Sequence, residues 1–280
     1  MMKKQEKVKI GILNLMHNKK ESQQQFAKVL TDGAEPVELT FYYPATHYNE
    51  RPVPAELRRI AKPLDLEEVK HLDAFIISGA PIEKLAFEEV RYIAEVKALL
   101  DVLAENDIEQ LYVCWGAMAA LNYFYGIQKR ILPAKVFGVY PNAIQSESNL
   151  LFGMPAGFPA PHARYAEMDH KQIAEHDDLA LLSSDMKGHL TLVEAAAAKQ
   201  TFLFSHLEYD KDALLKEYQR EAAAYPEAKQ KPARPEYYFK YPEKLEEPVF
   251  SWKKTQRRFY SNWLKQVSIA KNQNILAFEH

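Results

Sequence analysis

The stretch LYVCWGAMAALNYFYG, residues 111–126, contains the single cysteine of a chain of 280 residues. The apolar run that ends at Cys114 predicts a strand, and the helical pattern after it predicts a helix ending at Gly126, a residue typical of helix C-termini. In open α/β sheets, reactive groups lie at the carboxyl ends of strands, and a helix that starts there offers backbone N–H groups to an oxyanion. Cys114 is therefore a candidate nucleophile, and the alternative is a small buried residue of the core.

The first half of the chain alternates between strand-like and helix-like segments. The segments that predict strands are short and rich in apolar residues, at 8–15, 37–43, 73–78 and 110–114. Segments with helical character lie at 19–30, at 54–64 with a break at Pro63, and at 87–106. This alternation predicts an α/β fold with a mostly parallel sheet flanked by helices. The strand at 110–114 is apolar on both faces, which is typical of a central strand.

The second half of the chain is less regular. Strands at 189–196 and 200–205 predict a hairpin, and a helix is expected at 211–224. The proline-rich segment 225–250 has neither a helical nor a strand period, so we expect a long loop that wraps over the surface before a final tryptophan-bearing helix. We interpret residues 1–280 as a single α/β domain with insertions.

The composition excludes several classes of protein. The formal net charge is −2 and no basic field stands out, so neither nucleic acid nor an anionic membrane is an expected partner. No apolar run reaches about eighteen residues, so no membrane span is expected, and the short N-terminal apolar run predicts a strand instead of a signal peptide. One cysteine cannot form an intramolecular disulfide, which fits a reducing compartment and predicts a cytoplasmic protein.

A thiol nucleophile needs a base, and the base needs a group that orients it. His206 and Glu208 follow the strand at 200–205, and residues two apart in extended backbone point the same way. The carboxylate could then fix the tautomer of the imidazole and stabilise its charged form. The alternative is a solvated surface pair. Together with Cys114 at another strand end, the pattern favours a Cys-His-Glu site.

A cysteine at one strand end and His-x-Glu at a later one resembles class I glutamine amidotransferases. Further stretches resemble one group within that fold, the MetA-type homoserine O-acyltransferases, which include O-acetyl- and O-succinyltransferases. The matching stretches follow in order: ILNLMHNKKESQQQF, IISGAPIEKLAFEEVRYI, LYVCWGAMAALNYFYGI, LPAKVFGVY, APHARY, HLEYDKDALLKEYQRE, PEYYF and SWKKTQRRFYSNWL. The resemblance runs from about residue 8 to about residue 265 and implies a flavodoxin-like sheet of the glutamine amidotransferase type.

The resemblance also implies roles for particular residues. Cys114 would accept the acyl group, His206 would act as general base, and Glu208 would be its partner. Lys135 and Arg220 would contact the amino-acid substrate. Without the resemblance, Lys135 would be taken for a solvated lysine, and Arg220 could simply complement a helix dipole.

Glu83 lies where the family sorts its acyl donors, glutamate going with acetyl-CoA and glycine with succinyl-CoA. A carboxylate at the acyl pocket would repel the succinyl carboxylate but not the small, uncharged acetyl group. The same residue could also favour the N-terminus of the helix expected from residue 87.

The chain departs from the family pattern at several places, and three of them are single residues. Ala163 in APHARY replaces the serine that touches the amino-acid substrate in the family, His17 stands where a proline is usual, and Leu207 replaces the proline of the HPE motif. Ala163 therefore belongs to the expected acceptor pocket. Because that pocket has lost one hydroxyl, the acceptor need not be homoserine.

Together these features predict acetyl transfer from acetyl-CoA, through a Cys114 thioester, to the side-chain hydroxyl of L-homoserine, a step of methionine biosynthesis. L-Serine is the second acceptor, which would serve cysteine biosynthesis, and succinyl-CoA is the second donor. Glutamine amide hydrolysis and a non-enzymatic binding protein are the remaining alternatives. We expect no cofactor and no metal ion, with acetyl-CoA as a co-substrate, and a homodimer is compatible with the sequence.

Overall fold

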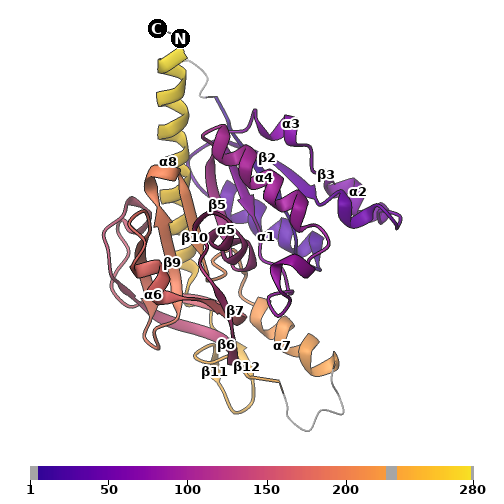
Figure 1. Cartoon of the computed structure of the whole chain (residues 1–280). Coiled ribbons are helices and arrows are strands. Elements are labelled where there is room, and N and C mark those ends of the chain that lie inside the picture. The colour runs from indigo at the N-terminus through magenta and orange to yellow at the C-terminus, as the bar shows by residue number, and fades with distance from the viewer. Residues whose placement is uncertain (1–5, 225–231, 279–280) are drawn as a thin grey trace.

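A computed structural model describes residues 6–224 and 232–278 of the chain (Figure 1). The strands are β1 (Val8–Leu13), β2 (Val37–Tyr43), β3 (Lys62–Pro63), β4 (Ala74–Ile77), β5 (Glu109–Val113), β6 (Lys129–Ile144), β7 (Phe158–Met168), β8 (Ala180–Asp185), β9 (Leu190–Ala195), β10 (Gln200–Leu203), β11 (Phe239–Tyr241) and β12 (Glu246–Pro248). The α-helices are α1 (Lys19–Thr31), α2 (Ala55–Ile60), α3 (Leu66–Val69), α4 (Ile93–Glu105), α5 (Trp115–Tyr125), α6 (His170–Ala174), α7 (Ala213–Ala224) and α8 (Lys253–Phe278). Short 3-10 helices are η1 (Thr46–Tyr48), η2 (Phe87–Glu89), η3 (Asn149–Leu151) and η4 (Ala196–Ala198).

Six neighbouring strands form the parallel half of a ten-stranded sheet. They follow the order β3-β2-β1-β4-β5-β10, and every residue of β4 and β5 is buried. α5 packs on β5 and β10, while α1 and α8 pack against each other beside β1 and β2. The predicted α/β fold with a mostly parallel, helix-flanked sheet is confirmed. β5 is the central strand that its two apolar faces indicated.

The other four strands extend the sheet in antiparallel fashion. β9 forms the predicted hairpin with β10, and β8, β6 and β7 follow beyond it. The sequence does not reveal β6, because Pro133 and Pro141 interrupt what would otherwise look like a strand. In the structure, Pro133 lies within a break of the register between Ile131 and Val136, and Pro141 opposes Pro159 of β7. The ladder thus breaks where Pro133 lacks its N–H.

Two predicted helices have different boundaries in the structure. The helix expected over 87–106 is divided into η2 and α4. The backbone is extended at Val90, whose side chain is buried, so the α-helix begins only with α4. The helix expected over 54–64 ends at Ile60. The following residues pair with β2 as β3, where Pro63 disfavours helical backbone at the residue before it.

The expectation of a strandless loop at 225–250 is wrong in part. β11 and β12 form a small antiparallel pair, in which Phe239 opposes Pro248 and Tyr241 opposes Glu246. These strands are only three residues long, which is too short for an apolar alternation to be recognised. The residues 225–231 of that predicted loop lie outside the described part of the chain.

The core of the molecule includes all three tryptophans. Trp115, Trp252 and Trp263 have no exposed surface, so they are core residues. Within the described ranges, no helix combines the length and the apolar character that crossing a membrane requires.

Glu109, the first residue of β5, is a buried carboxylate away from the strand's carboxyl end. Desolvation raises its pKa to about 7, although nearby Lys199 and Gln266 oppose the shift. The folded state therefore keeps a proton that the unfolded chain releases above about pH 4.5, so this group destabilises the fold progressively between about pH 4.5 and 7.

We expect Glu109→Gln to raise the free energy of unfolding by roughly 2 kcal/mol at about pH 8, and by far less at about pH 5. Denaturant unfolding at both pH values measures the difference, and an equal gain at both would contradict it.

Candidate active site

Cys114 lies on a tight turn between β5 and α5. Its backbone has φ +50° and ψ −108°, a conformation that residues other than glycine seldom adopt. Gly116 lets α5 begin close to the sheet, since a Cβ there would lie 2.6 Å from the carbonyl oxygen of Ile77. Cys114 therefore stands at the carboxyl end of a central strand, with the N-terminus of a helix beside it, where the sequence placed it.

His206 and Glu208 follow β10, the parallel neighbour of β5. Leu203 pairs with Val113, and the N–H of Cys114 donates to the carbonyl oxygen of Leu203 at 2.7 Å, so the two strands end at the same edge of the sheet. His206 Nδ1 lies 2.7 Å from Glu208 Oε1, and the imidazole lines the same pocket as Cys114, whose charge acts on it. The structure thus brings together the three residues that the sequence grouped as a Cys-His-Glu site.

Burial makes the electrostatics of this group strong. His206 and Glu208 are 2% and 3% exposed, so the alternative of a solvated surface pair is wrong. Burial by itself would lower the pKa of His206, but the charges of Glu208 and Cys114 outweigh it and raise the pKa well above its usual value. Tyr209 stacks on the imidazole with ring centroids 4.3 Å apart. The imidazole is therefore fixed in orientation and suited to take the proton of the thiol.

The loop at 78–81, after β4, closes the other side of the nucleophile. A Cβ at Gly79 would lie 3.1 Å from Cε1 of His206 and 3.3 Å from Cβ of Cys114, so this backbone passes directly beside the reacting groups. The first N–H groups of α5 have no acceptor within the helix. Together with the N–H groups of the loop, they are candidates to bind an oxyanion.

The catalytic pocket, into which Cys114 and His206 open, has a volume of about 610 Å³. Its wall includes Glu83, Ala163 and Arg220, which the sequence assigned to the donor and acceptor sites. Glu83 is buried, and its Oε1 accepts a hydrogen bond at 3.2 Å from a backbone N–H of β7. Its carboxylate thus bonds to the sheet and does not cap a helix.

Helix α7 supplies the charged wall of the pocket. Arg220 lines the pocket with Glu217 and Glu221, and none of the ion pairs formed by described residues includes Arg220. Lys135 of β6 pairs with both glutamates at 2.5 Å. Figure 1 shows α7 beside the end of the sheet that carries β6 and β7. A guanidinium available for binding therefore stands beside two carboxylates, an arrangement that complements the carboxylate and ammonium groups of a free amino acid.

Lys135 is absent from the wall of the catalytic pocket as the described residues form it. Its side chain is 2% exposed, so it is not a solvated lysine, and it lies behind Glu217 and Glu221 instead of on the pocket wall. The structure gives it the role of fixing two carboxylates, and a direct contact with substrate stays a prediction. Sequence reasoning missed both glutamates and Tyr209. The i, i+4 spacing of the glutamates on a predicted helix was the available signal.

A family model described as homoserine O-succinyltransferase matches residues 2–273. The chain belongs to this family. Two relatives show the breadth of the homoserine O-succinyltransferase family. A protein of Lactobacillus acidophilus named serine O-acetyltransferase is 49% identical over 262 residues, which cover 93% of this chain and 96% of the relative. A protein of Acetivibrio thermocellus named homoserine O-acetyltransferase is 32% identical over 258 residues, which cover 92% of this chain and 83% of the relative.

The solved structures agree with the fold. A glutamine amidotransferase of Thermotoga maritima matches with a TM-score of 0.60 at 11% identity, covering 94% of this chain and 99% of that one. This likeness concerns the fold alone and confirms the expected glutamine amidotransferase-like architecture. Membership of the homoserine O-succinyltransferase family confirms the predicted family and the predicted enzyme class, an acyltransferase. The names of the relatives differ in the acceptor.

Proposed function

We propose that the protein transfers an acetyl group from acetyl-CoA, through a thioester on Cys114, to the side-chain hydroxyl of L-serine. The observation that carries the proposal is the buried Cys114–His206–Glu208 group at a pocket that carries both charges needed for a free amino acid. The relative named serine O-acetyltransferase, at 49% identity, supports serine as acceptor. Homoserine, which the sequence analysis placed first, becomes the second candidate.

The first half-reaction loads Cys114. The thiol proton passes to the imidazole nitrogen of His206 that does not face Glu208, and the thiolate attacks the thioester carbonyl of the donor. Backbone N–H groups of the loop at 78–81 and of the first turn of α5 would stabilise the oxyanion. When the carbon–sulfur bond to CoA breaks, the CoA sulfur takes the proton from His206, and the acetyl group stays on Cys114.

The second half-reaction transfers the acetyl group from Cys114 to the acceptor. Acetylation removes the negative charge of Cys114, one of the two charges that raise the pKa of His206, so the neutral imidazole becomes available as a base. His206 takes the proton of the acceptor hydroxyl while the oxygen attacks the acetyl thioester. Cleavage of the bond to the Cys114 sulfur releases the O-acetyl amino acid, and the proton returns from His206 to the thiolate.

Acceptor binding follows from the charges of α7. Arg220 would pair with the carboxylate of the amino acid, while Glu217 and Glu221 would accept hydrogen bonds from its ammonium group. Ala163 of β7 also lines the catalytic pocket and presents a methyl group there, where the family resemblance leads one to expect the hydroxyl of a serine. A pocket without this hydrogen bond loses one reason to prefer homoserine over the shorter serine.

Donor selection follows from Glu83. Its buried carboxylate on the wall of the catalytic pocket would repel the carboxylate of a succinyl group, and this supports acetyl-CoA over succinyl-CoA.

Steady-state release of CoA from acetyl-CoA, measured with L-serine and with L-homoserine, tests the acceptor. We expect the higher kcat/KM with serine. Ala163→Ser should shift the ratio of the two kcat/KM values toward homoserine by roughly fivefold, the effect of one neutral hydrogen bond.

The control is Ala163→Gly, which changes the shape of the same wall without adding a hydroxyl and should not favour homoserine. An unchanged ratio in Ala163→Ser would show that position 163 does not select the acceptor. A protein that released no CoA with either amino acid but hydrolysed glutamine would overturn the proposed function.

A further inference from the structure

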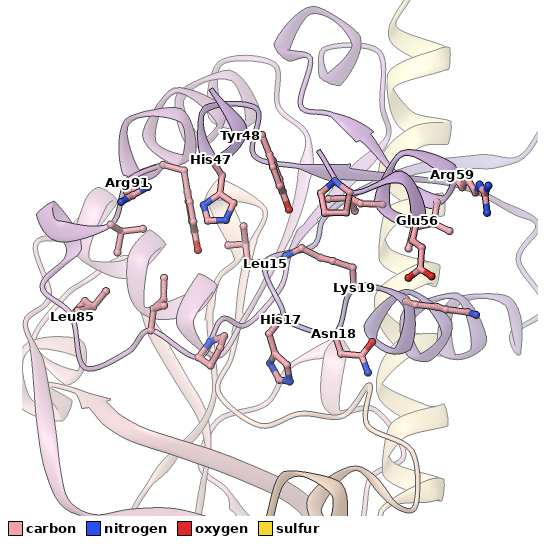
Figure 2. Close-up of a pocket in the computed structure, with 18 of the residues that line it drawn as sticks. Leu15, His17, Asn18, Lys19, His47, Tyr48, Glu56, Arg59, Leu85 and Arg91 are labelled. Carbon is pink, nitrogen blue, oxygen red and sulfur yellow. The ribbon is translucent and has the colours of Figure 1, made fainter. Parts of the chain in front are cut away.

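A second pocket adjoins the catalytic pocket and takes no part in the chemistry described so far. It has a volume of about 780 Å³, and its lining comes from α1, α2, η1 and the segment before α4 (Figure 2). His17, Pro81, Ile82 and Leu85 line both pockets. The two pockets therefore share a boundary, and a molecule bound in the second can extend toward Cys114.

The second pocket is rich in cations. Figure 2 shows Lys19 reaching into it, with Arg59 and Arg91 on opposite sides. None of the ion pairs within residues 6–224 and 232–278 includes any of these three side chains. Two acids also line the pocket, Glu56 and Glu89, but the carboxylate of Glu89 already accepts a hydrogen bond at 2.7 Å from a backbone N–H.

The environment of these cations favours an anionic ligand. Desolvation lowers the pKa of Lys19 to about 8, because the ammonium has lost water without gaining a counter-ion. The pKa values of His17 and His47 are also lowered, first by desolvation and then by nearby arginine side chains. A negatively charged ligand would relieve this repulsion.

Apolar and aromatic surface lies between the cations. Leu15, Tyr48, Leu57, Val90 and Tyr92 line the pocket. The segment that carries Tyr48 is held in place by a carboxylate of α4, which accepts hydrogen bonds from the backbone N–H groups of residues 45 and 46 at 2.7 and 2.9 Å. The pocket thus offers fixed apolar walls together with separated positive charges.

We propose that the second pocket binds the pantetheine arm and the phosphate-bearing nucleotide of the acyl-CoA, with Lys19, Arg59 and Arg91 as the phosphate contacts. This inference rests on the proposed function, because the acyl group must lie at Cys114 while the rest of a long donor extends out of the catalytic pocket. The arm is partly apolar, and the nucleotide is multiply anionic. The acceptor is small and zwitterionic, and the α7 wall of the catalytic pocket matches it instead.

Two donors of different length test the inference. Acetyl-CoA and S-acetyl-N-acetylcysteamine carry the same thioester, but the short donor lacks every phosphate. Arg59→Ala and Arg91→Ala are each expected to raise the KM for acetyl-CoA by about tenfold, the usual effect of one charge-assisted hydrogen bond, and to leave the KM for the short donor unchanged. Added salt should raise the KM for acetyl-CoA only.

Arg58→Ala is the matched control. Arg58 is the neighbouring exposed cation of α2 and does not line the pocket, so its removal should change neither KM. Mass spectrometry of the peptide that contains Cys114 reports whether each donor acetylates the thiol.

The outcomes separate this inference from the proposed function. If both donors acetylate Cys114 but the two arginine variants leave the KM for acetyl-CoA unchanged, the second pocket is not the CoA site and the proposed function stands. An equal rise in KM for both donors would also overturn the inference, because the arginines would then act on the catalytic pocket. If neither donor acetylates Cys114, the proposed function fails, and the inference fails with it.

Discussion

Replacing Cys114 by alanine is expected to reduce CoA-dependent turnover by about 10⁴-fold or more, since removal of a nucleophile from such a group eliminates the covalent route. Wild-type protein incubated with acetyl-CoA alone should carry one acetyl group on the peptide that contains Cys114, and the variant should carry none. Alanine has a Cβ, as cysteine does, and is strained to the same extent by the backbone conformation of this turn. The fold should therefore be retained, which circular dichroism would check. Normal turnover by Cys114→Ala would exclude the thioester mechanism.

Replacing His206 by asparagine is expected to reduce kcat/KM by about 10²–10⁴-fold, the usual contribution of a positioned acid–base group. Both half-reactions depend on this imidazole, so acetylation of Cys114 and transfer to the acceptor should slow together. Rapid-mixing measurements of each half-reaction would show this. A variant that loads normally but fails only in transfer would limit His206 to the second step.

Glu208→Gln is the companion variant, because it keeps the shape of the side chain and removes its charge. The charge of Glu208 is the first of the influences that raise the pKa of His206. Without it the imidazolium loses its proton more readily, so the neutral base is available at lower pH and the acidic limb of the pH–rate profile should move to lower pH. An unchanged limb would mean that another group sets it.

The parallel half of the fold was open to prediction because its signals are local. Buried strands such as β4 are continuous apolar runs, and the helix after β5 ends at a glycine with φ +68°. β6 and β7 gave no such signal. Their pairing depends on contacts between distant segments, and the register break around Pro133 hides the strand from any short-range pattern.

The candidate site was predictable to a similar degree. Cys114, His206 and Glu208 could be grouped because strand ends fix their positions, which is a property of topology. The position of Lys135 could not be derived, since its burial depends on how α7 packs against β6 across more than eighty intervening residues.

The interpretation of residues 1–280 as one domain stays a prediction.

The turn at Cys114 also bears on how the chain can be engineered. Holding a non-glycine residue at φ +50° and ψ −108° costs about 1–3 kcal/mol of folding free energy, so the backbone is strained at the residue that would act as nucleophile. Glycine would release this strain and lengthen the lifetime of the native state on heating, at the loss of the sulfur. Directed evolution that selects for heat resistance alone would therefore favour glycine at position 114 and yield an inactive protein. A screen for thermostable variants must measure product formation in the same round.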